Sequence, residues 1–430
     1  MSRQFLCILF SFFFFGTQSQ NTIKTYVQNN ASRIISIDPD SLSYTDLESM
    51  GTAIGDARIV MLGEQYHGDA ATFLAKSRLV KYLHEKKGFD VLAFESDFYA
   101  LNEGWDRLPK VKKEIDSFMY KNPFQIWGYC FTCNNLFYDY IAKTFTTTSP
   151  LEVTGFDCQV HGEYSIKNLV GNVKTYFDET GRTNDSISKY APIVLSLLDS
   201  TVTPKYPKTV TTCNTLINGL EIIYEQIFVN TKGGGFWLQV IKNLVANAKK
   251  IKAELENNLS LYHIRDTQMA DNIDWLCKNK YKGKKIIVWA HNAHIAKNSG
   301  DHFNYNTTDR NMMGSYIDNN PALKDQVYRI GFTSYEGTAQ WATNAKWHME
   351  LQKPQKNSFE NWIDKKYDYA FVDFKRFREL NPGYDSPFFM KGSIYDSHKN
   401  YWHPWTNTFE GVFFIREMYG CKFYGGSTPQ

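Results

Sequence analysis

The chain has 430 residues, of which 43% are hydrophobic and 22% charged, so its composition excludes a disordered, collagenous or coiled-coil protein. Its 48 basic and 45 acidic residues leave a formal net charge of +3, which gives no electrostatic reason to expect a nucleic-acid partner. Aromatic residues make up 16% of the chain. That share suits a large core, or a cleft that holds a bulky and partly apolar ligand.

The first residues predict an export signal. Arg3 precedes an apolar run over 5–15, which is followed by small and polar residues up to Ser19. A basic start, a short apolar run and small residues near a cleavage site describe a secretory signal peptide, and the run is too short to span a membrane. We therefore predict a signal peptide over residues 1–19 and an exported mature chain, periplasmic or secreted, without a membrane span. A buried N-terminal strand is the alternative.

The cysteines are compatible with export. Once Cys7 is removed with the signal, six remain: Cys130, Cys133, Cys158, Cys213, Cys277 and Cys421. Cys130 and Cys133 form a C-x-x-C, which in an exported protein favours a disulfide over a redox pair or a zinc site. A zinc ribbon would need a second C-x-x-C, and the sequence has none. Buried free thiols are the alternative, and the overall pairing stays open.

Short apolar runs predict the strands. Each has four mostly apolar residues without polar alternation, as in strands that are covered on both faces. The runs are 59–62, 91–94, 153–156, 286–289, 329–332 and 369–372. Amphipathic patterns over 70–87, 236–256 and about 262–280 predict helices. This alternation predicts an α/β fold, with a mainly parallel sheet flanked by helices.

Two parts of the chain depart from the alternation. The middle, about 160–275, predicts a helical insertion that covers the cleft. The tail from about 380 is rich in Pro, Gly and aromatic residues and predicts irregular packing. No internal repeat is visible, so we treat 20–430 as one domain.

Polar residues gather where the predicted strands end. The segments are 63–68, the turn after 91–94, and 289–295. The residues concerned are Glu64, His67, Glu95, His291 and His294. Ligands bind at the carboxyl ends of parallel strands, so these side chains predict a site. Taken singly, His67 could be a loop histidine, Glu95 a helix cap, and the histidine pair a metal or oxyanion site.

Several of these motifs occur together in a fixed order. A G-E-x-x-H-G segment, a G-F…E strand, an R-D…M-x-x-N helix and a W-A-H-N-x-H strand end follow one another. The residues that match these four motifs are, in order, Gly63, Glu64, His67 and Gly68; Gly88, Phe89 and Glu95; Arg265, Asp266, Met269 and Asn272; and 289–295. Gly155, Phe156 and Asp157 match as well. In these motifs, over roughly residues 55–335, the sequence resembles the erythromycin esterase family.

The resemblance implies hydrolysis of a carboxylic ester or lactone. In known members the substrate is the lactone of a macrolide antibiotic, an activity that confers antibiotic resistance. By analogy His67 is the general base that activates water, and Glu64 and Glu95 position and polarise it. His291 and His294 would help to bind the developing charge. No serine nucleophile is needed, and no G-x-S-x-G is present.

The same resemblance implies a substrate-binding set. Arg265 would line the cleft together with His294, and Lys76 and Arg78 stand where members carry paired arginines. We expect a small-molecule ester or lactone as the partner, and neither a cofactor nor a metal. The alternative is a metal- or haem-binding module on the same scaffold, with a ligand set formed by Glu64, His67, Glu95 and His291. Metal analysis of the purified protein separates the two hypotheses.

Overall fold

The computed structural model describes residues 20–182, 184–202, 208–231, 235–258, 260–298, 312–340, 348–392 and 398–422. The predicted signal peptide, residues 1–19, lies outside this part of the chain. Among the described residues, no helix has the length and apolar character that a membrane crossing requires.

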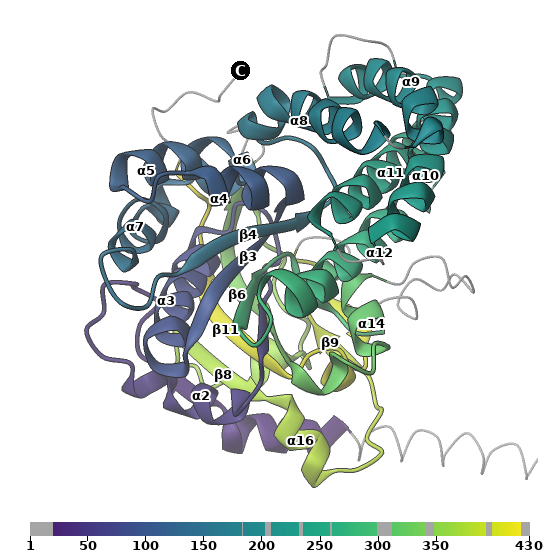
Figure 1. Ribbon diagram of the computed structural model, residues 1–430. Helices are drawn as coiled ribbons and strands as arrows, with labels where there is room; N and C mark the ends of the chain where they lie inside the picture. Colours follow the sequence, from purple (N-terminus) through teal and green to yellow (C-terminus); the bar gives the residue numbers. More distant parts are fainter. Residues whose placement is uncertain are drawn as a thin grey trace, which may run out of the picture.

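A mixed, mostly parallel sheet forms the centre of the molecule (Figure 1). Among the described residues it has nine strands in the order β1-β8-β11-β6-β2-β5-β3-β4, with β7 paired to β6. Their bounds are β1 (Ser32–Ile34), β2 (Ile59–Leu62), β3 (Phe89–Asp97), β4 (Glu152–Asp157), β5 (Lys285–Trp289), β6 (Val327–Gln340), β7 (His348–Glu350), β8 (Tyr369–Asp373) and β11 (Gly411–Met418). Every neighbouring pair from β11 to β4 is parallel, so the predicted α/β class is confirmed.

Alternate residues of the central strands enter two separate cores. Val60 and Leu62 belong to one hydrophobic cluster, whereas Ile59 and Met61 belong to the cluster on the other face. Successive strand side chains point to opposite faces. Both faces of β2 are therefore buried, which explains why its sequence shows no polar alternation.

Helices cover the sheet and extend beyond it. They are α2 (Glu48–Ile54), α3 (Ala70–Lys87), α4 (Trp105–Arg107), α5 (Lys112–Lys121), α6 (Gln125–Gly128), α7 (Ile141–Thr144), α8 (Glu163–Gly181), α9 (Asp185–Val202), α10 (Val210–Thr231), α11 (Phe236–Leu255), α12 (Ser260–Trp275), α13 (Asn292–Ile295), α14 (Met313–Asp318), α15 (Phe359–Trp362) and α16 (Phe374–Leu380). α3 ends at Gly88, whose φ of 71° is left-handed, a conformation that glycine adopts without steric cost.

The chain between β4 and β5 forms a helical segment, α8–α12. In Figure 1 the teal and green helices of this segment project from the end of the sheet to which the β4 arrow points. Successive helices pack on one another and share a core of their own. α12 returns to the sheet, where Asn272 Nδ2 donates to the carbonyl of Phe156 at 2.8 Å. This contact places the C-terminal part of α12 beside the carboxyl end of β4.

Two expectations for the C-terminal tail and the cysteines were wrong. The tail contributes β11, which lies between β8 and β6 in the sheet; its apolar run 412–415 is buried. Cys130 is bonded to Cys421, with Cα atoms 5.8 Å apart, whereas Cys133 is a buried free thiol. The C-x-x-C spacing predicted a disulfide between Cys130 and Cys133. In the fold, the segment after β11 brings the sulfur of Cys421 to Cys130 instead.

Candidate active site

Four neighbouring parallel strands supply the site. β2, β5, β3 and β4 are adjacent in that order, so their carboxyl ends share one edge of the sheet. Glu64 follows β2, His291 follows β5, Glu95 lies near the end of β3, and Asp157 ends β4. The order of the strands thus gathers side chains that are up to 227 residues apart in the sequence.

The close approach of the loops after β2 and β5 explains why residue 63 is a glycine. Asn292 Nδ2 donates to the carbonyl of Phe332 at 2.7 Å, and the backbone N–H of Asn292 donates to the carbonyl of Glu64 at 2.9 Å. A Cβ at Gly63 would stand 1.9 Å from Asn292 Oδ1. Only glycine leaves room for this arrangement, which locks the loop after β2 against the loop after β5.

Glu64 and His67 form the centre of the site. Glu64 Oε1 lies 2.6 Å from His67 Nδ1. The Glu64 side chain is fully buried, whereas the His67 side chain is 16% exposed. His67 is therefore the member of the pair that solvent or a substrate can reach. Because a carboxylate only accepts hydrogen bonds, Nδ1 carries the hydrogen, and in the neutral ring Nε2 carries the lone pair.

Two further groups hold Glu64. Lys76 Nζ donates to Glu64 Oε2 at 2.6 Å and stands 4.2 Å from the centre of the Trp289 ring. Trp127 Nε1 donates to Glu64 Oε1 at 3.3 Å. Burial acts to raise the pKa of Glu64, but Lys76 and His67 outweigh it and hold that pKa below its usual range. Burial lowers the pKa of Lys76 to about 8, so the two form an ion pair at neutral pH.

A second cluster surrounds Glu95. Arg265 Nη2 donates to Glu95 Oε1 at 2.7 Å, and the backbone N–H of His291 donates to Glu95 Oε2 at 2.9 Å. Arg265 Nη2 also donates to Asp157 Oδ2 at 2.7 Å. Burial acts to raise the pKa of Glu95, but His294 and Arg265 hold it well below its usual range. Glu95 is therefore a carboxylate whose two oxygens both have partners.

His294 carries a positive charge in this cluster. Its Nδ1 lies 2.6 Å from Asp266 Oδ1, and its Nε2 lies 3.1 Å from Glu95 Oε1. Burial acts to lower the pKa of His294, but Asp266 and Glu95 outweigh it and raise it to about 10. Both ring nitrogens then donate. The 3.1 Å approach of Arg265 Nη1 to Nε2 is consequently a contact between two donors, compensated by the surrounding carboxylates.

This charge makes a prediction for stability. The pKa of His294 is near 6.5 in the unfolded chain and about 10 in the fold, so its stabilisation is complete below pH 6.5 and is lost as the pH rises towards 10. The difference in unfolding free energy between wild type and His294→Gln should shrink over this range by on the order of 2–4 kcal/mol. Urea denaturation at several pH values measures it. A difference that stays constant from pH 6 to 10 would contradict the assignment.

His291 connects the two clusters. Its ring centre lies 5.3 Å from that of His67 and 6.4 Å from that of His294. Its Nδ1 accepts from the backbone N–H of Ala293 at 3.0 Å, and its Nε2 donates to the carbonyl of Gln65 at 2.9 Å. Burial lowers the pKa of His291 to about 3. The ring is therefore neutral and held in one tautomer, with both nitrogens engaged by the backbone.

The structure does not bring Arg78 to the site. Its guanidinium donates to Asp46 at 2.6 and 2.8 Å and to the carbonyl of Ser43 at 2.7 Å. Side chains two residues apart on a helix point to nearly opposite sides. Lys76 and Arg78 therefore cannot play the same role, and Arg78 ties α3 to the N-terminal loop. Lys76 itself is fully buried beneath Glu64, rather than exposed to a substrate.

Four residues of the site were not singled out as functional from the sequence. Asp157 and Asp266 lie inside the motifs, and they hold Arg265 and His294 respectively. Trp127 lies in the four-residue helix α6, where no periodicity points to a contact with Glu64. Phe124 precedes α6 and packs edge-on against His67, with ring centres 5.8 Å apart.

Comparison with protein families shows to which family the chain belongs. The family described as Erythromycin esterase matches residues 84–418. The chain belongs to the erythromycin esterase family. The match contains Glu95, Arg265, His291 and His294, and the 63–68 segment precedes it. Membership implies a small-molecule substrate.

Individual relatives agree with this assignment. A protein of Bacillus subtilis (strain 168) named "Putative hydrolase YbfO" is 26% identical in an alignment 409 residues long that covers 86% of this chain and 86% of that protein. A Bacillus cereus protein of solved structure aligns with a TM-score of 0.70 at 20% identity, over 94% of this chain and 99% of that one. A variant of the erythromycin esterase EreC in its open conformation gives 0.64 at 14% identity, over 91% and 98%. The two structures establish a shared fold.

The donor set of this erythromycin esterase family member bears on the metal-binding alternative. Among the described residues, no three His, Cys, Asp or Glu side chains stand at metal-ligand spacing. Both nitrogens of His291 and both oxygens of Glu95 already have protein partners. A metal bound by these groups would first have to displace hydrogen bonds that order the loops.

Proposed function

We propose that the protein hydrolyses a carboxylic ester or lactone by means of water that His67 activates. The observation that carries the proposal is the 2.6 Å contact between a buried Glu64 carboxylate and Nδ1 of the partly exposed His67. A carboxylate in this position selects one imidazole tautomer and stabilises the imidazolium that forms when the ring takes a proton. Family membership and the hydrolase relative support the reaction class.

The reaction runs in two steps. His67 Nε2 takes a proton from water while the water oxygen attacks the carbonyl carbon, which gives a tetrahedral intermediate with a negative oxygen. The intermediate then breaks its bond to the alkoxide oxygen, and the imidazolium of His67 returns the proton to that leaving group. Glu64 stays ionised throughout. The products are a carboxylic acid and an alcohol.

The Glu95 cluster places two cationic side chains on the other side of His291, each held by carboxylates. His294 and Arg265 are both cationic, and their side chains are 8% and 14% exposed. We assign them to the negative charge that develops on the substrate, because preorganised cations in a dry site stabilise such charge strongly. Glu95 and Asp157 hold Arg265 in place, so it need not reorganise during the reaction.

Aromatic rings beside His67 suit an acyl or lactone ring. Phe124 stands 5.8 Å from the His67 ring, and His161 stands 5.5 Å from Phe124. The side chains of Phe124 and His161 are both partly exposed. Apolar walls with a few converging polar groups are typical of small-molecule sites. We propose macrolide lactones as one candidate class of substrate among the cyclic esters.

A screen tests the proposal. Purified wild type and His67→Ala are assayed side by side against aryl esters, simple lactones and macrolide lactones. We expect turnover of at least one ester or lactone by wild type only. Equal rates for the two proteins, or no turnover of any ester or lactone, would contradict the proposed function.

We also propose export, with cleavage near Ser19. The run over 5–15 carries this inference, and the Cys130–Cys421 disulfide suits an oxidising compartment. Mass spectrometry of the protein recovered from the periplasm or medium should show loss of the first ~19 residues. An intact Met1 on protein from the soluble cytoplasmic fraction would contradict it.

A further inference from the structure

The end of the described chain lies against the site. The C-terminal strap, residues 419–422, follows β11 and pairs with the loop that carries His67. The backbone N–H of Cys421 donates to the carbonyl of Gly68, and that of Ala70 donates to the carbonyl of Tyr419, both at 2.9 Å. The strap therefore holds the backbone on the C-terminal side of His67.

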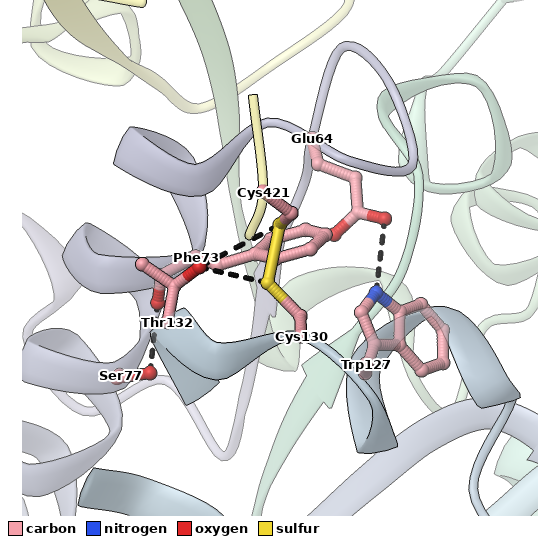
Figure 2. The surroundings of a disulfide bond; sticks show 7 residues. All are labelled: Glu64, Phe73, Ser77, Trp127, Cys130, Thr132 and Cys421. Carbon is pink, nitrogen blue, oxygen red and sulfur yellow. Dashed lines mark hydrogen bonds between the residues drawn. A yellow bond between two sulfur atoms is a disulfide. The ribbon is translucent and has the colours of Figure 1, made fainter. Parts of the chain in front are cut away.

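The same strap holds the segment that carries Trp127. Cys421 is bonded to Cys130, and the backbone N–H of Phe131 donates to the carbonyl of Lys422 at 2.7 Å. The hydroxyl of Thr132 lies 2.7 Å from the sulfur of Cys130 and 3.6 Å from that of Cys421. Figure 2 shows Thr132 on one side of the disulfide and Trp127, with its bond to Glu64, on the other.

Trp127 depends on these links for its position. It lies in α6, which has four residues and is too short to be stable by itself. The backbone N–H of Cys130 donates to the carbonyl of Trp127 at 3.3 Å, so the disulfide acts on the turn that ends α6. Trp127 is fully buried and shares Glu64 Oε1 with His67.

We propose that Trp127 is a positioning residue for the Glu64–His67 pair, and that the Cys130–Cys421 disulfide holds it and the His67 loop in register. The proposal rests on the proposed function, which makes His67 the base. Without the disulfide, only backbone pairing joins the strap to the His67 loop and to Phe131: the hydrogen bonds from Cys421 to Gly68, from Ala70 to Tyr419 and from Phe131 to Lys422. Glu64 Oε1 then loses a fixed donor, and the His67 ring loses the wall that orients it.

A dithiol breaks the link in a balanced step. It supplies two electrons and two protons, the sulfur–sulfur bond is cleaved, Cys130 and Cys421 become thiols, and the dithiol closes to a cyclic disulfide. Cys133 does not replace the reagent, because burial raises the pKa of its thiol and keeps it protonated.

Reduction of the folded, full chain tests the proposal. We expect dithiothreitol to lower kcat about three- to thirty-fold with KM within about twofold, as for loss of one hydrogen bond to a charged group. Cys421→Ala should show the reduced value and no further response to dithiothreitol. Cys213→Ala, which removes a buried free thiol from α10, is the matched control and should respond as wild type does.

Trp127→Phe separates positioning from general stabilisation. It keeps a ring but removes the N–H, and should lower kcat to a similar extent. Reduction of this variant should then lower kcat by a smaller factor than in wild type, because both changes remove the Trp127–Glu64 hydrogen bond. Full kcat after reduction, or losses that multiply in the Trp127→Phe background, would overturn the proposal.

Hydrogen exchange decides the question independently of activity. On reduction, peptides over 66–70 and 125–133 should exchange faster, while those over α8–α11 stay unchanged. If the oxidised chain hydrolyses no ester, the proposed function fails. The exchange result still tests whether the disulfide holds Trp127 and the His67 loop in place. Unchanged exchange in both peptides on reduction would overturn this role of the disulfide.

Discussion

His67→Ala is expected to lower kcat/KM for the ester or lactone substrate by about 10²–10⁴-fold, the usual worth of general-base catalysis. Water is a poor nucleophile at neutral pH, and His67 is the imidazole whose proton Glu64 orients at 2.6 Å. The fold should survive, because the His67 side chain is partly exposed and leaves only a small gap. Steady-state kinetics and a denaturation curve on the same sample separate the two effects.

Two controls sharpen this result. His348→Ala, on β7 and with a side chain that is 54% exposed, should keep wild-type activity. Dialysis against a strong chelator should leave the wild-type rate unchanged if His67 acts as a simple base. Activity that disappears on chelation and returns with one divalent metal would instead assign the water to a metal, whose charge lowers the pKa of bound water.

The strands and the polar groups at their ends could be predicted from local sequence. The run 59–62 coincides with β2, and the pattern over 70–87 coincides with α3, because burial on both faces and a glycine cap leave local signals. Which strands become neighbours is a long-range property. The sequence therefore placed Glu64, Glu95 and His291 at strand ends, but it could not place Asp157 beside Arg265.

The groups that act on Glu64 were harder to predict for a physical reason. Lys76 belongs to the buried face of α3, where a lysine is expected to avoid burial unless it is paired, and its partner lies 12 residues earlier. Trp127 lies 63 residues after Glu64, in the four-residue helix α6, which is too short to show a periodic pattern. The Cys130–Cys421 bond spans 291 residues. Such contacts depend on the tertiary fold, so no local sequence pattern predicts them.

Glu64→Gln is expected to lower kcat about ten- to a thousand-fold with a smaller change in KM, because it removes an interaction that strengthens in the transition state. Glu64 Oε1 accepts from His67 and Trp127, and Oε2 accepts from Lys76. A glutamine has one acceptor oxygen. Whichever way it turns, an NH₂ group faces donors, and the neutral amide no longer stabilises the imidazolium.

A second variant distinguishes this loss from misfolding. In Glu64→Gln the buried Lys76 ammonium loses its carboxylate, and breaking such a pair costs about 3–5 kcal/mol. Adding Lys76→Met removes the unpaired charge, and lets the glutamine oxygen face His67. The double variant should therefore regain much of the stability but little of the turnover, because the charge beside the imidazolium is still missing. Recovery of turnover together with stability would mean that Glu64 serves the fold alone, and that the negative charge beside His67 plays no part in the reaction.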